Sequence, residues 1–162
     1  MAHYTTSIET GAPAEVAFAY LADFSNAQHW DPSVVRAQRL TPEPIDWGSR
    51  FEILLGFPGG VTTRLEYRIT RFDPNRCIAF EADTKALRCL DTIEIERRAH
   101  GCRVHYDADL RLHGAAYLLD LPIHLAFQIS GARSVRGLES ALAELGDAAV
   151  SDFGRLRTIA AR

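Results

Sequence analysis

The sequence predicts one α+β domain, in which a seven-stranded antiparallel sheet curves around a long C-terminal helix. Between Val34 and His113, polar and apolar residues alternate with a period of two, interrupted by turn-forming residues, which is typical of a meander of strands. Between Pro122 and Gly146 the apolar residues recur at helical spacing. Because a sheet with one apolar face needs a covering layer, we expect this helix to pack on it.

Composition narrows the class of protein. At 162 residues and 47% hydrophobic content, the chain is long enough for one domain with a substantial core. The net charge is −3 with both signs dispersed, so no basic surface suggests nucleic acid as a partner. No apolar run approaches the roughly 20 residues needed to span a bilayer, and the first residues lack the pattern of a signal peptide. Three cysteines without C-x-x-C spacing indicate reduced thiols, no structural metal and a cytoplasmic location.

The first third of the chain predicts a strand and two short helices. His3–Glu9 alternates weakly and is expected to form the first strand. Pro13 can occupy the first position of a helix, where its missing N–H is not needed. A second short helix is expected to end at Trp30, because Pro32 forces Asp31 into an extended conformation. The first helix buries one face, formed by Ala17, Tyr20, Leu21 and Phe24.

The turns of the central region predict the register of the strands. All four hairpins place apolar residues on the same face, which is informative because a slip of one residue would reverse every side chain. The predicted register also places Glu94 opposite Asp107, where the two negative charges would repel each other. The expected inward pairs are Phe51 with Tyr67 and Ile53 with Leu65 about Pro58-Gly59-Gly60, Ile69 with Phe80 about a four-residue loop at Asp73–Arg76, Ile93 with Ile78 about Lys85-Ala86, and Asp91 with Leu110 about His100-Gly101.

The C-terminal helix has two unlike halves. Its second half is solidly apolar, whereas polar or small residues interrupt the stripe in its first half, at His124, Gln128 and Gly131. We expect the domain to span 1–146 and a tail to span 147–162. In the tail, apolar residues recur every three positions, which fits either a frayed appendage or a contact helix in a homodimer. They are Val150, Phe153, Leu156 and Ile159.

Several short segments together resemble the START-like (SRPBCC) superfamily, which groups polyketide cyclases/dehydrases with lipid-transport proteins. The resemblance implies the helix-grip fold, with the order β-α-α-β₆-α and a ligand cavity under the last helix. It implies no shared catalytic motif that could be transferred to this chain. The segments are Ile8 to Phe18, Trp30-Asp31-Pro32, Gly48 leading into Phe51, Tyr67-Arg68-Ile69 with Asp73-Pro74-Asn75-Arg76, Gly101-Cys102-Arg103-Val104, and the closing helix.

Asp91 is the main candidate for a functional residue, because it is the single acid on the inward row. A buried carboxylate is unfavourable unless it is paired or its pKa rises. The position therefore predicts either a group directed at a ligand or a sheet position wetted by solvent. Tyr67 and Tyr106 also point inward, where they could offer hydroxyl groups to a ligand or pack in the core.

The covering helix and the aromatic residues complete the predicted site. His124 and Gln128 lie one turn apart and could hold a ligand's polar end, although a histidine satisfied near a helix start is an alternative. Gly131 leaves room either for a ligand or for close helix–sheet contact. Trp30 is either part of the wall or a plug at the end of the core. The expected apolar wall consists of Phe51, Ile53, Leu65, Phe80, Leu110 and Phe127.

These features favour a carrier or sensor for a hydrophobic small molecule, aromatic or polycyclic, without a cofactor. One alternative is a metal-independent enzyme of the cyclase/dehydrase type, in which Asp91 with His124 or a tyrosine supplies acid and base. Another is a protein-interaction module that uses the outer face of the sheet or the tail.

Overall fold

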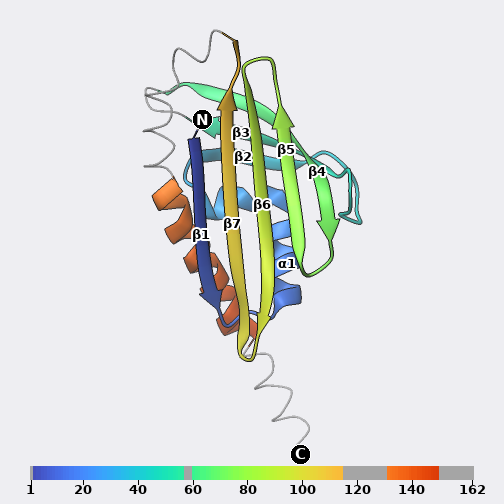
Figure 1. The fold of residues 1–162 in the computed structure, drawn as a ribbon, viewed down its shortest axis with the longest axis vertical. Coiled ribbons are helices and arrows are strands. Elements are labelled where there is room, and N and C mark those ends of the chain that lie inside the picture. Colours follow the sequence, from blue (N-terminus) through green and yellow to red (C-terminus); the bar gives the residue numbers. More distant parts are fainter. Residues whose placement is uncertain (1, 57–59, 115–130, 150–162) are drawn as a thin grey trace, which may run out of the picture.

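The computed structural model describes residues 2–56, 60–114 and 131–149 (Figure 1). The chain starts with β1 (Ala2–Thr10), α1 (Ala14–Ala22), the 3-10 helix η1 (Phe24–Asn26) and α2 (Ala27–Trp30). Six strands follow, and the helix at 131–149 comes last: β2 (Val34–Arg39), β3 (Arg50–Gly56), β4 (Thr62–Asp73), β5 (Cys77–Asp83), β6 (Leu87–Arg98) and β7 (Gly101–Leu112).

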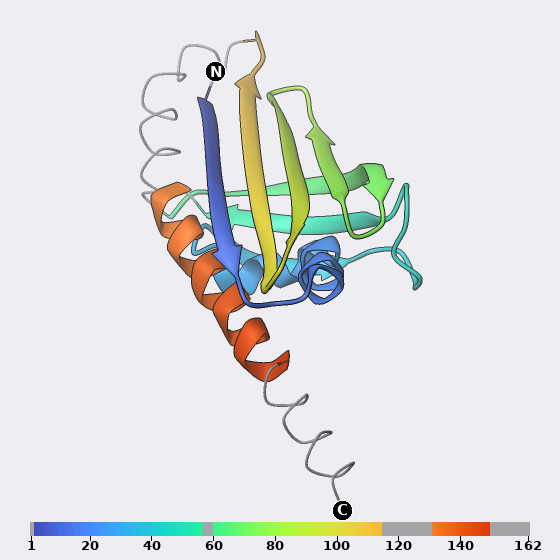
Figure 2. The same cartoon turned by 60° about the horizontal axis from the view of Figure 1, so that its bottom comes forward.

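The seven strands form a single antiparallel sheet in the order β1-β7-β6-β5-β4-β3-β2. The sheet bends strongly, so that β2, β3 and β4 run across the direction of β1, β7 and β6 (Figure 2). The helices α1, α2 and 131–149 lie together on one side of it, with the last helix alongside β1 (Figures 1 and 2). This arrangement confirms the α+β helix-grip fold that the sequence predicts.

The inner face of the sheet carries the core, as the period-two pattern predicts. Alternate residues along β6 are buried, and the residues between them face solvent or are half-exposed. The predicted pairs about three of the turns are present: Phe51 with Tyr67, Ile53 with Leu65, Ile69 with Phe80, and Ile93 with Ile78.

The register between β6 and β7 differs from the prediction by two residues. The turn is Ala99-His100, and Gly101 is already the first residue of β7, paired with Arg98. Gly101 has a φ of +103°, and a Cβ there would lie 2.0 Å from the carbonyl oxygen of Thr10, so glycine is required at this position. Because the shift is even, it leaves every side chain on its predicted face. It also removes the expected like-charge contact, since Glu94 pairs with His105.

The hairpin between β4 and β5 is also tighter than expected. Asp73 pairs with Cys77, which leaves a loop of three residues in place of the predicted four. Asn75 adopts a φ of 62° within this loop, a conformation that asparagine tolerates better than most residues. A register shift between Ile69 and Arg71 compensates for the missing residue and restores the predicted pairing further along the strands.

The last helix is anchored to the beginning of the chain. Leu138 and Leu142 are fully buried, and the Thr10 hydroxyl donates a 2.8 Å hydrogen bond to the Leu142 carbonyl. The prediction that the helix ends at Gly146 is wrong, because it continues to residue 149. A Cβ on Gly146 would lie 3.1 Å from the Ala12 nitrogen, so this glycine permits close packing of the helix against the segment that follows β1. Residues 115–130 and the tail from 150 onward lie outside the described residues.

Candidate ligand-binding site

Asp91 lies in the middle of β6 and faces inward. Its cross-strand neighbours are Phe80 on β5 and Ala108 on β7, so the predicted neighbour Leu110 is displaced by the shift in register. Only 7% of Asp91 is exposed. The Tyr106 hydroxyl donates a 2.5 Å hydrogen bond to Asp91 Oδ1. The carboxyl is therefore buried on the inner face, which contradicts the interpretation of a sheet position wetted by solvent.

The environment of Asp91 shifts several pKa values. Burial raises the pKa of the Asp91 carboxyl to about 7. Hydrogen bonds from Tyr106 and Tyr67 oppose this rise, whereas the negative charges of Asp31 and Asp107 add to it. Burial, followed by the nearby Asp91, raises the pKa of both tyrosines well above the usual value. At neutral pH the tyrosines therefore keep their protons, while the carboxyl titrates.

Cys89 completes a group of four polar side chains, which we call the polar cluster: Tyr67, Cys89, Asp91 and Tyr106. Cys89 stands two residues before Asp91 on the same face of β6 and pairs with Ala82. Burial raises the pKa of its thiol to about 12, and a hydrogen bond with Tyr67 acts in the opposite direction. The thiol is therefore neutral and serves as a weak hydrogen-bonding group.

The inner face is buried around the polar cluster. Toward α1, Ile93 is 1% and Ile95 is 7% exposed. Tyr106 and Ala108, beside Asp91, are each 8% exposed. At the far end of the same strands, Leu87 and Leu112 are half-buried. The polar cluster is therefore buried, and it lies between the core near α1 and the half-buried ends of β6 and β7.

Phe24 covers the part of the inner face formed by Phe51, Tyr67 and Phe80. Its ring stacks on Phe80 with centroids 4.2 Å apart and meets Tyr67 edge-on at 5.0 Å. It also makes an edge contact with Phe51 at 6.4 Å. Phe51 and Phe80 are completely buried, so the protein's own aromatic residues occupy this part of the predicted ligand wall. The helical pattern identified Phe24 as buried, but not as the partner of these residues.

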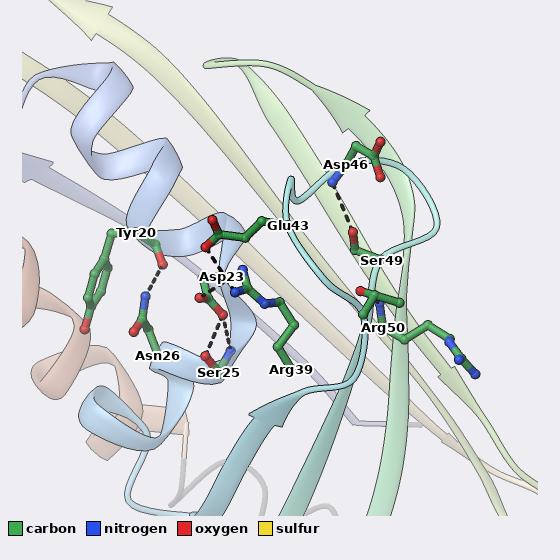
Figure 3. A network of polar contacts seen from close by, with 10 residues as sticks. Tyr20, Asp23, Ser25, Asn26, Arg39, Glu43, Asp46, Ser49 and Arg50 are labelled. Atoms are coloured by element: carbon green, nitrogen blue, oxygen red, sulfur yellow. Dashed lines mark hydrogen bonds and ion pairs between the residues drawn. The ribbon is translucent and has the colours of Figure 1, made fainter.

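A polar network fixes the segment that carries Phe24 (Figure 3). The Asp23 carboxylate accepts hydrogen bonds from the Ser25 backbone N–H at 3.1 Å and the Ser25 hydroxyl at 2.5 Å. Arg39 on β2 approaches the same carboxylate at 3.8 Å. The Asn26 side-chain amide donates to a main-chain carbonyl of α1 at 2.8 Å. These contacts tie η1 to α1 and to the edge of the sheet, which holds the Phe24 ring in place.

Trp30 closes one side of the polar cluster. Its ring is buried and meets the Tyr106 ring edge-on, with centroids 5.9 Å apart. A Cβ on Gly137 would lie 2.0 Å from the Trp30 carbonyl oxygen, so the last helix approaches α2 very closely. The Ser134 hydroxyl also donates a 2.7 Å hydrogen bond to Asp31. Trp30 is therefore both a plug between helix and sheet and a neighbour of the candidate site.

The remaining predicted site residues fall into four groups. Leu110 is buried on β7, two residues beyond Ala108 on the same face, whereas Ile53 and Leu65 belong to the sealed core. Gly131 permits close contact, because a Cβ there would lie 2.8 Å from the Tyr4 ring. The last three, His124, Phe127 and Gln128, lie outside the described residues. Cys89 was not predicted, although its place two residues from Asp91 on the inward row could have indicated it.

In the described part of the chain, the positively charged residues lie at the surface. Asp91 is the single buried charged residue within the described ranges, and no lysine, arginine or histidine there is buried. Arginines on the outer face pair with acids, as Arg64 does with Glu52 at 3.2 Å and Arg88 with Glu81 at 2.6 Å. No helix in the described part of the chain is long and apolar enough to cross a membrane.

Solved structures with similar folds include aromatase/cyclases. The Zhui aromatase/cyclase from Streptomyces sp. R1128 matches with a TM-score of 0.70 and 12% identity, covering 86% of this chain and 92% of that one. TTHA0849 from Thermus thermophilus matches with a TM-score of 0.68 and 18% identity, covering 91% and 97%. The di-domain ARO/CYC BexL from the BE-7585A biosynthetic pathway matches with a TM-score of 0.64 and 11% identity, covering 86% of this chain and 49% of that one.

These identities are low, so the structural likeness shows the fold alone. No curated protein matches the sequence. The family model described as "Polyketide cyclase / dehydrase and lipid transport", however, matches residues 1–143, which is most of the chain. The protein therefore belongs to the polyketide cyclase/dehydrase and lipid transport family.

Proposed function

We propose that the protein binds a hydrophobic small molecule, aromatic or polycyclic, against the inner face of the sheet, with the ligand's polar group at the polar cluster. The observation that carries this proposal is the burial of Asp91 on an otherwise apolar row. A buried carboxyl without a cationic partner lowers stability, and an apolar residue would pack there at less cost. Buried carboxyls with shifted pKa values are common at functional sites.

The side chains around Asp91 favour a ligand at this position. Ala108 and Ala82 are the cross-strand neighbours of Asp91 and Cys89, and their short side chains occupy less space on the inner face than a larger apolar residue would. Trp30, Tyr106 and Leu110 add apolar area on the same face of the sheet. A mostly apolar wall with a few convergent polar groups is the usual composition of small-molecule sites.

The main test is native mass spectrometry of freshly purified protein, with extraction and identification of any molecule that co-purifies. Ala108→Leu would fill the space beside Asp91, so we expect it to lose the bound mass. Asp109→Leu changes the next residue, whose side chain points to the outer face, and should retain it. Thermal melts would confirm that both variants fold. A wild-type protein that binds neither a co-purified molecule nor an added apolar fluorophore would contradict the proposal, as would normal binding by Ala108→Leu.

A second candidate is catalysis of the cyclase/dehydrase type, which the pKa of Asp91 favours. A carboxyl that titrates at about 7 can both accept and return a proton at neutral pH. The hydrogen bond from Tyr106 fixes the orientation of this carboxyl. The family and the aromatase/cyclase neighbours are compatible with such a reaction. Turnover of a polyketide-like substrate that Asp91→Asn abolishes, with binding retained, would support the enzyme over the carrier.

A further inference from the structure

We propose that the site selects ligands whose polar group is uncharged, such as a phenol, an alcohol or a ketone, and rejects carboxylates and phosphates. This inference rests on the proposed function and specifies its ligand class. Several elements contribute the described groups around Asp91. On its own strand the neighbour is Cys89; β7 contributes Tyr106, and β4 contributes Tyr67. Asp31, which follows α2, also acts on the carboxyl.

None of these groups can carry a positive charge. Among the described residues, the one further charged group that acts on the carboxyl is Asp107, which is also negative. None of the described basic residues is buried: they lie on the outer face of the sheet, in loops, or on exposed sides of the helices, as His29, Arg133 and Arg136 do. Arg103, for example, bonds Glu9 with Nε and Oε1 2.7 Å apart, and Arg111 bonds Asp109 at 3.1 Å. Within the described residues the wall of the site therefore contains neutral and negative groups, but no cation.

An anionic ligand would be poorly accommodated by such a wall. Its carboxylate or phosphate would lose hydration without gaining a cation, and it would approach a carboxyl that is itself partly ionised at neutral pH. Proteins that recognise these anions usually present arginine, lysine or a helix N-terminus.

A hydroxyl or carbonyl group meets suitable partners at the same place. The Tyr67 and Tyr106 hydroxyls and the protonated form of Asp91 can donate to a ligand oxygen. The ionised form of Asp91 can accept from a ligand hydroxyl. A neutral hydroxyl on the ligand is thus compatible with both protonation states of Asp91. A carboxylate could accept hydrogen bonds from the protonated form, but it would be buried without a counter-charge and would be repelled by the ionised form.

Three probes with one ring system test this inference: 2-naphthol, methyl 2-naphthoate and 2-naphthoate. Calorimetric titrations at pH 7.5 with the full chain should show binding of the two neutral probes and at least tenfold weaker binding of the acid. The ester and the acid share their ring skeleton, so the ratio of their affinities isolates the effect of the charge. Equal affinity for ester and acid would overturn the inference while leaving the proposed function intact.

The contribution of Asp91 is tested by Asp91→Asn, which removes the negative charge and keeps a hydrogen-bonding side chain. We expect the ratio of ester affinity to acid affinity to fall at least threefold in this variant. Asp109→Asn, on the outer face, should keep the wild-type ratio. An unchanged ratio in Asp91→Asn would contradict the assigned role of Asp91. If the wild type binds none of the three probes, the inferred ligand class is overturned, whereas the proposed function is decided separately by the co-purified molecule and the apolar fluorophore.

Discussion

The buried Asp91 carboxyl makes a specific prediction about how stability depends on pH. In the unfolded chain this carboxyl ionises near 3.8, whereas in the folded protein its pKa is about 7. Between these values the folded state holds a proton that the unfolded state has lost, so rising pH destabilises the fold. At about 1.4 kcal/mol per pKa unit, the difference between the two pKa values lowers the free energy of unfolding by about 4 kcal/mol once Asp91 is ionised in both the folded and the unfolded state. Roughly 3 kcal/mol of this develops between pH 5 and pH 8.

Replacing Asp91 with Asn removes the titration and leaves a side chain of similar shape. We would measure the free energy of unfolding of both proteins by urea denaturation at pH 5 and at pH 8. Relative to wild type, the variant should gain about 3 kcal/mol on going from pH 5 to pH 8, because its amide has no proton to lose. Comparing variant with wild type cancels the titration of all other groups that behave alike in both.

Asp109→Asn is the matched control, since Asp109 lies on the neighbouring strand with its side chain on the outer face, bonded to Arg111. It should show no comparable gain at pH 8. The quantity to compare is the difference in free energy of unfolding between Asp91→Asn and wild type at each pH. If this difference changes by less than about 0.5 kcal/mol from pH 5 to pH 8, the carboxyl is not buried in the way described, and the reasoning is refuted.

Other predictions concern the groups around this site. Tyr106→Phe removes a donor to Asp91, so the carboxyl pKa followed by NMR should rise, and stability should fall by about 1–3 kcal/mol; an unchanged pKa would contradict the hydrogen bond. Phe24→Ala should cost about 3–5 kcal/mol in urea denaturation, and Phe24→Leu clearly less; equal losses would argue against the ring stacking. Gly137→Ala should melt at a Tm at least about 5 °C lower than that of Gly131→Ala. The new Cβ at 137 would meet a main-chain oxygen at 2.0 Å, whereas the new Cβ at 131 would meet the Tyr4 ring, which can move. Similar melting temperatures would count against the close contact between the last helix and α2.

The sequence predicts the fold well because the sheet repeats one simple constraint. The period-two pattern assigns each side chain to a face, and this pattern alone is enough to place Asp91 inward. The same constraint does not detect an even slip in register, since Gly101 can belong to the turn or to the strand without changing any face. The predicted contact between Glu94 and Asp107 was the available sign of that slip.

The slip also explains why the main contact of the site was missed. With Leu110 opposite Asp91, Tyr106 would stand four residues along β7 from that position; with Ala108 opposite, it stands two residues away on the same face, which is within reach of a hydroxyl. The Phe24 stacking could not be predicted for a different reason. It depends on where η1 crosses the sheet, and no periodicity along the chain encodes that position.

The pairing of β1 with β7 imposes an order on assembly. Strands β2 to β7 join neighbours in the chain, so each hairpin can form as soon as its own residues are available. The first strand has no such neighbour, and its partners run from Cys102 to Leu110. During synthesis on the ribosome, residues 2–10 must therefore wait for nearly the whole sheet to emerge, and the Thr10–Leu142 hydrogen bond then joins strand and final helix. The beginning of this polypeptide is among the last parts to reach its native place.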